Sequence, residues 1–346
     1  MSVFLRPVEH TNAHPYLILD SGAYSAWKSG KVVDLAAYEA YLRTVKDYLL
    51  TAVTLDTIPG AAGRFATDHE NEAACIASFK IWKRLRAGPV PVFPVFHQSD
   101  HKRWLWRYLE EGATYIGISP TDSFPADVRQ HWLITVHQHL LDNGVKLNRE
   151  VFTHALGVFA PSFLPKMRGM VWSADASSLM QWCTTRRLAF PLRHDGKISH
   201  TAEFESIARV YVGERGHHHD SVDAGAVEHY LHAIGMGDHY RRVGERIVMD
   251  IYALTAANLR IANLVMALSG VRCFLAGSDQ RVMRQAAVEG QYPYLLATYA
   301  SITEKAGSTI ERLYHRNLKL PGSRGRPPTV IAQTNTRGLF DLPPTS

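Results

Sequence analysis

The first half of the chain alternates between two hydrophobic patterns. Short apolar runs rich in β-branched and aromatic residues recur, and each predicts a buried strand. These runs are YLIL (16–19), AVTL (52–55), VPVFPVF (90–96), TYIGI (114–118), VFTHALGV (151–158) and MVWSA (170–174).

The segments between these runs have the periodicity of amphipathic helices. Asp34 can cap a helix with apolar residues at helical spacing, and Thr67 or Asp68 can begin another that ends near Gly88. Asp100 can cap a third helix that stops at Gly112, and a fourth runs over 125–141. A strand–helix–strand repeat predicts parallel strands joined by right-handed crossovers.

Both a closed barrel and an open doubly wound sheet have this repeat. The first strand is not followed by a dinucleotide-type glycine fingerprint, which disfavours the open-sheet alternative. We therefore predict an α/β fold, a TIM-type (β/α) barrel with a helix-rich C-terminal insertion or extension. Six strands are evident, so closure needs further strands, for which RLAFPL (187–192) and CFLAG (273–277) are candidates.

The pattern changes after about residue 200, where helices are predicted over 202–212, 224–234 and 240–268. The predicted organisation is the main part of a catalytic barrel over 1–200, a helix-rich region with the closing barrel elements over 201–320, and an extended tail over 321–346. The tail contains PGSRGRPPTV, which is rich in Pro, Gly and Arg.

Composition narrows the class of protein. The chain has 346 residues, a net charge of +6 and three distant cysteines, so a disulfide framework is not expected. The beginning of the chain lacks the apolar core of a signal peptide, and the apolar region 247–268 is interrupted by polar residues such as Asp250 and Arg260. We expect a cytoplasmic protein, and its positive charge favours a polyanionic partner.

The candidate chemistry lies where the predicted strands end, since a parallel barrel places its catalytic groups there. Three strands end in aspartate, namely Asp20, Asp56 and Asp175. An aspartate at such a turn often serves only as a cap, but aspartate is disfavoured in strands and three together favour a function. Two carboxylates in one pocket suit a double displacement, in which one attacks and the other moves protons.

Six segments resemble, in order and spacing, the motifs of the tRNA-guanine transglycosylases. They are LDSGAYS, VTLDTIPG, PVFHQSD, YIGISP, THALGV and SADASS, and they span roughly residues 16–187. Members of that family are barrel enzymes that exchange a guanine in nucleic acid for a 7-deazaguanine.

The resemblance implies a role for each matching residue. Asp175 corresponds to the nucleophile that attacks C1′, and Asp20 to the general acid/base that contacts the incoming base. Tyr24 corresponds to the aromatic residue that stacks on the base, next to the turn at Ser21. Asp56 corresponds to the carboxylate that reads the guanine edge. The remaining expected base-pocket residues are His97 or Gln98, Gly117, Leu156 and Gly157.

The sequence also departs from the motifs of the tRNA enzymes, and these differences bear on which nucleic acid is modified. The tRNA enzymes bind zinc through a Cys-x-Cys-x-x-Cys cluster, and this sequence has no such cluster. In these departures the sequence resembles a divergent branch of the family, which is found in bacteriophages and bacterial modification clusters. Members of that branch insert 7-deazaguanines, such as 7-cyano-7-deazaguanine, into DNA. We expect DNA as the acceptor and no cofactor. The alternatives are tRNA, a non-catalytic nucleic-acid-binding paralogue and a barrel glycosidase.

Two further groups of residues have open interpretations. His217, His218, His219 and Asp220, with His229, His232 and His239 nearby, are either a polar surface or a zinc site. The pairs Arg186–Arg187 and Arg241–Arg242 either follow phosphates or are scattered surface charges.

Overall fold

The fold is built on a parallel sheet that closes on itself. The computed structural model describes residues 16–60, 64, 66–121, 124–160, 162–197, 199, 206–214, 223–276, 294–299 and 310. Nine strands are hydrogen-bonded in the order β3-β2-β1-β13-β12-β7-β6-β5-β4. The two outer strands, β3 (Val92–Phe93) and β4 (Val95–His97), are consecutive and are separated by Pro94 alone. The carbonyl of Pro94 still accepts the N–H of Gly117 on β5, so the pairing continues and the ring closes as a TIM-type barrel.

The predicted barrel is therefore confirmed, and the six predicted runs form seven of its strands, since the run 90–96 contains both β3 and β4. The other barrel strands are β1 (Tyr16–Asp20), β2 (Thr51–Val53), β5 (Tyr115–Ser119), β6 (Phe152–Ala155), β7 (Ser173–Ala176), β12 (Arg272–Ala276) and β13 (Tyr294–Thr298). Closure uses CFLAG as β12, as predicted, but also β13, which the hydrophobic pattern did not single out.

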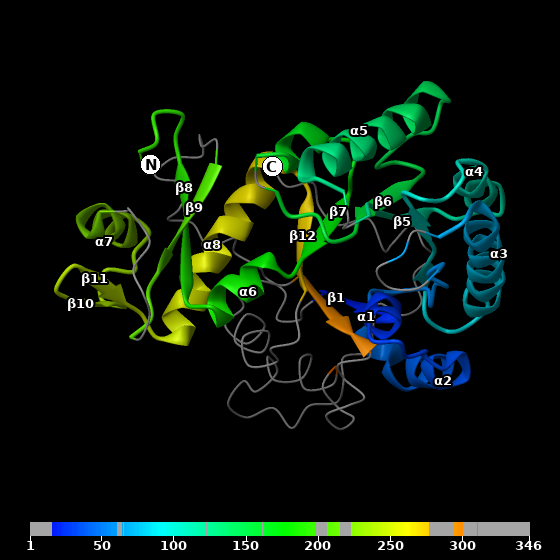
Figure 1. Cartoon of the computed structure of the whole chain (residues 1–346), viewed down its shortest axis with the longest axis horizontal. Coiled ribbons are helices and arrows are strands. Elements are labelled where there is room, and N and C mark those ends of the chain that lie inside the picture. Colours follow the sequence, from blue (N-terminus) through cyan, green and yellow to red (C-terminus); the bar gives the residue numbers. More distant parts are fainter. Residues whose placement is uncertain are drawn as a thin grey trace.

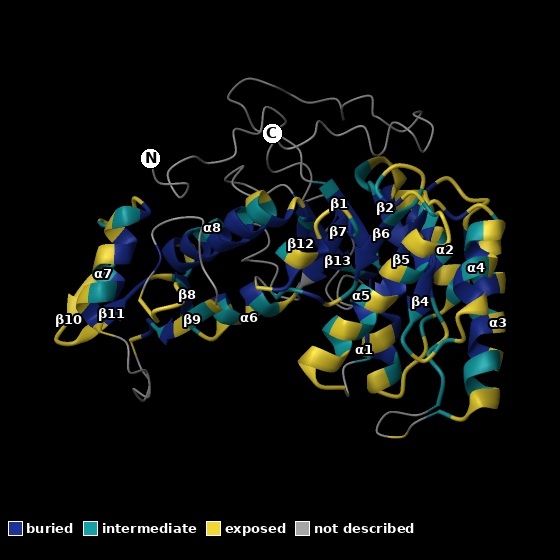
Figure 2. Cartoon of the chain, turned by 90° about the horizontal axis from the view of Figure 1, so that it is seen from above, coloured by how far each residue is buried: buried dark blue, intermediate teal, exposed yellow. Residues whose placement is uncertain are grey.

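Helices surround the barrel, with exposed outer faces and buried inner faces (Figures 1 and 2). Asp34 caps α2 through the N–H of Ala37, and Thr67 forms a capping box with Glu70 at the start of α3. Asp100 is not a cap, because its carboxylate accepts the N–H of His97 instead. These elements are α1 (Ala23–Lys28), α2 (Leu35–Val45), α3 (Asp68–Leu85), α4 (Arg103–Glu110), α5 (Ala126–Asp142) and the 3-10 turns Lys46–Tyr48 and Leu164–Met167.

An insertion between β7 and β12 differs from three of the sequence predictions. RLAFPL forms β8, which pairs antiparallel with β9 outside the barrel, so it is not a barrel strand. The helix predicted over 202–212 is wrong, since residues 206–211 form strand β9, all six of whose residues pair with β8. The helix predicted over 240–268 begins later, because Gly244 turns a hairpin at positive φ and Asp250 then caps α8. The elements are α6 (Ser178–Thr184), β8 (Arg187–Leu192), β9 (Ser206–Tyr211), α7 (Ala224–Ala233), β10 (Arg241–Val243), β11 (Arg246–Val248) and α8 (Ile251–Ser269).

Helix α8 joins this insertion to the barrel. It lies between the two hairpins and β12 (Figure 1), and among the described helices it alone has the length and apolar composition to cross a membrane. Most of its apolar side chains are buried within the protein. The buried Asn258 accepts the N–H of Ala189 at 2.8 Å and donates to the carbonyl of Arg187 at 2.9 Å. One side chain therefore attaches α8 to strand β8.

We predict that Asn258→Leu destabilises the protein by about 2 kcal/mol, because two buried backbone groups lose their hydrogen-bond partner. Urea unfolding followed by circular dichroism measures this loss. Asn143→Leu, at an exposed position after α5, is the control and should change stability by less than about 0.5 kcal/mol. Equal stability of both variants would contradict a structural role for Asn258.

Candidate functional site

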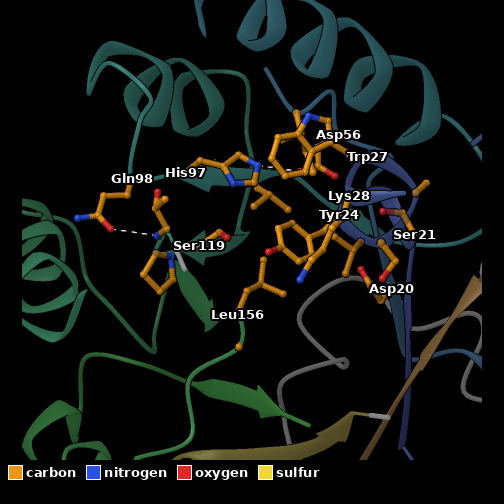
Figure 3. Close-up of a pocket in the computed structure, with 18 of the residues that line it drawn as sticks. Asp20, Ser21, Tyr24, Trp27, Lys28, Asp56, His97, Gln98, Ser119 and Leu156 are labelled. Carbon is orange, nitrogen blue, oxygen red and sulfur yellow. Dashed lines mark hydrogen bonds and ion pairs between the residues drawn. The ribbon is translucent and has the colours of Figure 1, made fainter. Parts of the chain in front are cut away.

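A cavity of about 1050 Å³ opens at the carboxyl ends of the barrel strands. This volume is slightly larger than the ~300–1,000 Å³ of ordinary ligand pockets. Figure 3 shows the side chains that line it converging from β1, α1, β4, β5 and the loop after β6. Nine of the ten residues predicted for the site line this cavity: Asp20, Ser21, Tyr24, Asp56, His97, Gln98, Leu156, Gly157 and Asp175.

Gly117 has a different place. It is buried in β5, where an added Cβ would lie 3.0 Å from the side chain of Leu156 and 3.2 Å from that of Phe93. Glycine at this position thus lets Leu156 pack against the barrel interior while still lining the cavity. Gly117 therefore affects the site indirectly, through the position of the Leu156 side chain.

Asp20 lies at the end of β1, a strand whose Leu17, Ile18 and Leu19 are fully buried. Gly22, at φ 74°, turns the chain so that its N–H reaches the carboxylate of Asp20. Burial, followed by the charges of Asp175 and Asp56, raises the pKa of Asp20 to about 7. This carboxyl group can therefore both donate and accept a proton near neutral pH.

Asp56 and His97 form an ion pair across the cavity, with 2.7 Å between Oδ2 of Asp56 and Nε2 of His97. Burial opposes the charge on the imidazole, but the hydrogen bond to Asp56 and the nearby Asp100 outweigh it and raise the pKa of His97 to about 9. His97 is therefore an imidazolium at neutral pH, and one oxygen of Asp56 is already occupied.

Gln98 is turned away from Asp56. Its Oε1 accepts the N–H of Thr121 at 3.0 Å, and Figure 3 shows this bond at the edge of the cavity. Of the two residues that matched the base-reading glutamine, the structure thus brings His97, and not Gln98, next to Asp56.

Asp175 is buried at the cavity floor and is held by two donors on one oxygen. The N–H of Gly157 lies 2.8 Å from its Oδ1, and Nε2 of His154 lies 3.1 Å from the same atom. His154 is fully buried, and its Nδ1 lies 2.7 Å from the hydroxyl of Ser173. The sequence interpretation did not single out His154, Ser173 or their neighbour Tyr115.

Tyr24 and Trp27 form an aromatic wall on α1. Tyr24 is 46% exposed and lines the cavity. Trp27 donates its indole N–H to the carbonyl of Gly60, which fixes α1 against the loop after β2. The hydroxyl of Ser21 accepts the N–H of Ala23 and so stabilises the turn into α1. Tyr24 and the three carboxylates thus line the same cavity.

Metal ligands are not grouped in the described part of the chain, where no cluster of three His, Cys, Asp or Glu side chains could hold an ion. His217, His218, His219 and Asp220 lie outside the described residues. His232 interacts with the hydroxyl of Tyr240, and Arg242 with Glu228 and Glu245. Arg241 pairs with Glu214, so this arginine pair has intramolecular partners.

No protein-family model matches the chain, and no curated protein matches it in sequence. Solved structures with a similar fold include an alpha-galactosidase from Saccharomyces cerevisiae (TM-score 0.40, 9% identity, 88% of this chain and 62% of that one). A deoxyribose phosphate aldolase from Aeropyrum pernix has a TM-score of 0.34 and 10% identity, with 84% of this chain and 87% of that one covered. A chitinase domain from Pyrococcus furiosus has a TM-score of 0.36 and 8% identity, with 91% of this chain and 100% of that one covered.

The raised pKa of Asp20 predicts a pH-dependent cost in stability. Below about pH 4 the carboxyl is protonated in both the folded and unfolded states, so it has no effect. As the pH rises from 3.8 to about 7, only the unfolded state gains from ionisation, and the folded state is progressively destabilised. The rise in pKa corresponds to at most about 4 kcal/mol, and partial exposure to solvent reduces it.

We therefore expect Asp20→Asn to be more stable than the wild type by about 1–3 kcal/mol at pH 8 and nearly equal at pH 4. Chemical unfolding at the two pH values measures this difference. Asp47→Asn, at an exposed position, should show no such change. A stability difference for Asp20→Asn that does not grow with pH would refute the raised pKa.

Proposed function

We propose that this protein is a base-exchange transglycosylase that replaces guanine in DNA with a 7-deazaguanine through a covalent aspartyl-nucleotide intermediate. The observation that carries the proposal is the convergence of Asp20, Asp56 and Asp175 on one cavity beside the exposed ring of Tyr24. Each carboxylate has a different environment, which supports a different chemical role for each. The order of the motifs supports the same reaction.

Asp175 is the proposed nucleophile. One of its oxygens, Oδ1, is held by two donors, and the residue lines the cavity. Attack on C1′ forms a C–O bond and breaks the bond to N9 of guanine, which requires the nucleotide to leave the base stack. Asp20, with its pKa near 7, donates a proton to the departing guanine.

The second half of the reaction reverses these steps. The incoming 7-deazaguanine transfers its N9 proton to Asp20 and attacks C1′, which releases Asp175 as a carboxylate. One base leaves with a proton and the other arrives with one, so both aspartates end as they began. Exchange therefore needs neither a redox cofactor nor an external acid.

Base reading is assigned to Asp56 and His97. The ion pair presents a carboxylate that accepts from the N–H groups of a guanine-like edge and an imidazolium that can donate to its carbonyl. The ring of Tyr24 would stack on the base. This pair takes the place of the amide in the resembled family.

DNA is the preferred acceptor because the sequence departs from the tRNA enzymes and lacks their cysteine cluster. Lys28 and Lys31 are exposed and line the cavity, which places positive charge where a phosphate backbone would pass. Arg64 also lines the cavity but is paired with Glu70 at 2.6 Å. That charge suits either nucleic acid, so the acceptor is decided by experiment.

Asp175→Asn is expected to abolish incorporation of labelled 7-cyano-7-deazaguanine into DNA, because an amide cannot attack C1′. Mass spectrometry of nucleosides from treated DNA measures incorporation, with Asp47→Asn as the active control. Full activity of Asp175→Asn would refute the mechanism. Incorporation into tRNA alone would favour the tRNA alternative, and salt-sensitive DNA binding without exchange by the wild type would indicate a non-catalytic paralogue.

His97→Phe is expected to raise the KM for the free base at least about 10-fold, because hydrogen bonds to charged groups contribute roughly 1.5–3 kcal/mol. Gln98→Ala is the matched variant at the neighbouring position and should leave this KM within about 3-fold, since Gln98 bonds to Thr121. The opposite ranking of the two variants would show that Gln98 reads the base.

A further inference from the structure

A chain of buried polar side chains lies directly beneath the cavity floor. Tyr115, His154 and Ser173 come from three adjacent strands, β5, β6 and β7, and all three point into the barrel. The hydroxyls of Tyr115 and Ser173 are 2.6 Å apart, and Ser173 lies 2.7 Å from Nδ1 of His154. The chain ends at Asp175, whose Oδ1 lies 3.1 Å from Nε2 of His154.

The direction of these hydrogen bonds follows from Asp175, at which the series of hydrogen bonds ends. An ionised Asp175 can only accept, so Nε2 of His154 carries the hydrogen of that bond. Nδ1 then accepts from Ser173, and Ser173 accepts from Tyr115. In this arrangement each donor along the chain points toward the carboxylate.

The imidazole has little freedom to turn. His154 is fully buried, and its ring lies 5.8 Å from that of Phe93 and 5.9 Å from that of Phe274, measured between centroids. The N–H of Gly157 binds the same Asp175 oxygen from the loop after β6. Oδ2 of Asp175 accepts no hydrogen bond from the residues that the structure describes, and Asp175 lines the cavity.

A serine, a histidine and an aspartate in contact also occur in serine hydrolases, but the order here excludes that chemistry. Ser173 is fully buried on the far side of His154 from Asp175, so a substrate in the cavity cannot reach its hydroxyl. Asp175 is the member of the chain that meets the cavity. The hydrogen-bonded side chains therefore act on the carboxylate of Asp175.

We propose that His154 is a positioning residue, which with the N–H of Gly157 saturates Oδ1 of Asp175 and leaves Oδ2 as the attacking atom. This inference rests on the proposed function, in which Asp175 is the nucleophile. A carboxylate fixed in this way cannot rotate between equivalent orientations, so the attacking oxygen is already oriented when C1′ arrives.

The test compares His154→Leu, which removes the donor, with His154→Gln, whose amide nitrogen can donate from nearly the position of Nε2. We expect His154→Leu to lower kcat about 100-fold, because a misplaced catalytic group costs about this much. The KM for the free base should stay within about 3-fold, and His154→Gln should recover at least about 10-fold in kcat.

His137→Leu is the matched control, since His137 is also fully buried and hydrogen-bonded, to Leu133 and Thr153, but does not line the cavity. It should reduce thermal stability and leave kcat nearly unchanged. If His154→Leu does not fold, Ser173→Ala replaces it, with a smaller loss of kcat expected. Wild-type kcat in a folded His154 or Ser173 variant would overturn the positioning role and leave the proposed function intact.

A spectroscopic readout separates the two proposals. In protein labelled with ¹⁵N-histidine, His154 should give an Nε2–H resonance that is absent in His154→Leu and shifted in Asp175→Asn. If the wild type exchanges no base, the proposed function fails, and this shift alone then decides whether His154 holds Asp175. A resonance that does not respond to Asp175→Asn would overturn the inference.

Discussion

The site depends on one electrostatic constraint, which is that three carboxylates share a cavity with limited access to water. Like charges in such a place raise each other's pKa unless each finds a partner. Asp56 is neutralised by His97, and Asp175 is held by the N–H groups of Gly157 and His154. Asp20 has no cationic partner among the described residues, and its burial, followed by the charges of Asp175 and Asp56, raises its pKa to about 7. The three side chains are alike in chemistry and differ in what surrounds them.

The barrel makes this arrangement possible because its closed ring brings the ends of distant strands to one place. Asp20 and Asp175 are far apart in sequence but lie on β1 and β7, which β12 and β13 connect. Closure at the opposite side relies on Pro94, which interrupts one strand without ending its pairing with β5. Beneath the carboxylates, the interior contains aromatic rings and the polar chain from Tyr115 to His154. The floor of the site is thus part of the core.

The sequence predicted those parts of the protein that local patterns determine. The ends of the predicted strands placed Asp20, Asp56, His97 and Asp175 at one face of a barrel, and the structure brings them together. The hairpin β8–β9 was missed because an apolar run such as RLAFPL has the same composition in a barrel strand and in a covered hairpin. His154 had a readable signal, namely polar residues on the same face of adjacent strands, but only the register of β6 and β7 shows that they touch. The orientation of Gln98 depends on the backbone of Thr121, which no local pattern encodes.

In the proposed reaction, the coupling between Asp20 and Asp175 also orders the steps. The charge of Asp175 is one cause of the raised pKa of Asp20, so free Asp175 favours a protonated Asp20. When Asp175 becomes an ester with the sugar, that charge disappears, and Asp20 becomes a stronger acid at the moment the departing guanine needs its proton. The ionised Asp20 can then accept the N9 proton of the incoming base. Release of Asp175 restores its charge and raises the pKa of Asp20 again, which retains the proton until the next cycle. Proton transfer and covalent bonding are thus linked through one electrostatic interaction between the two carboxylates.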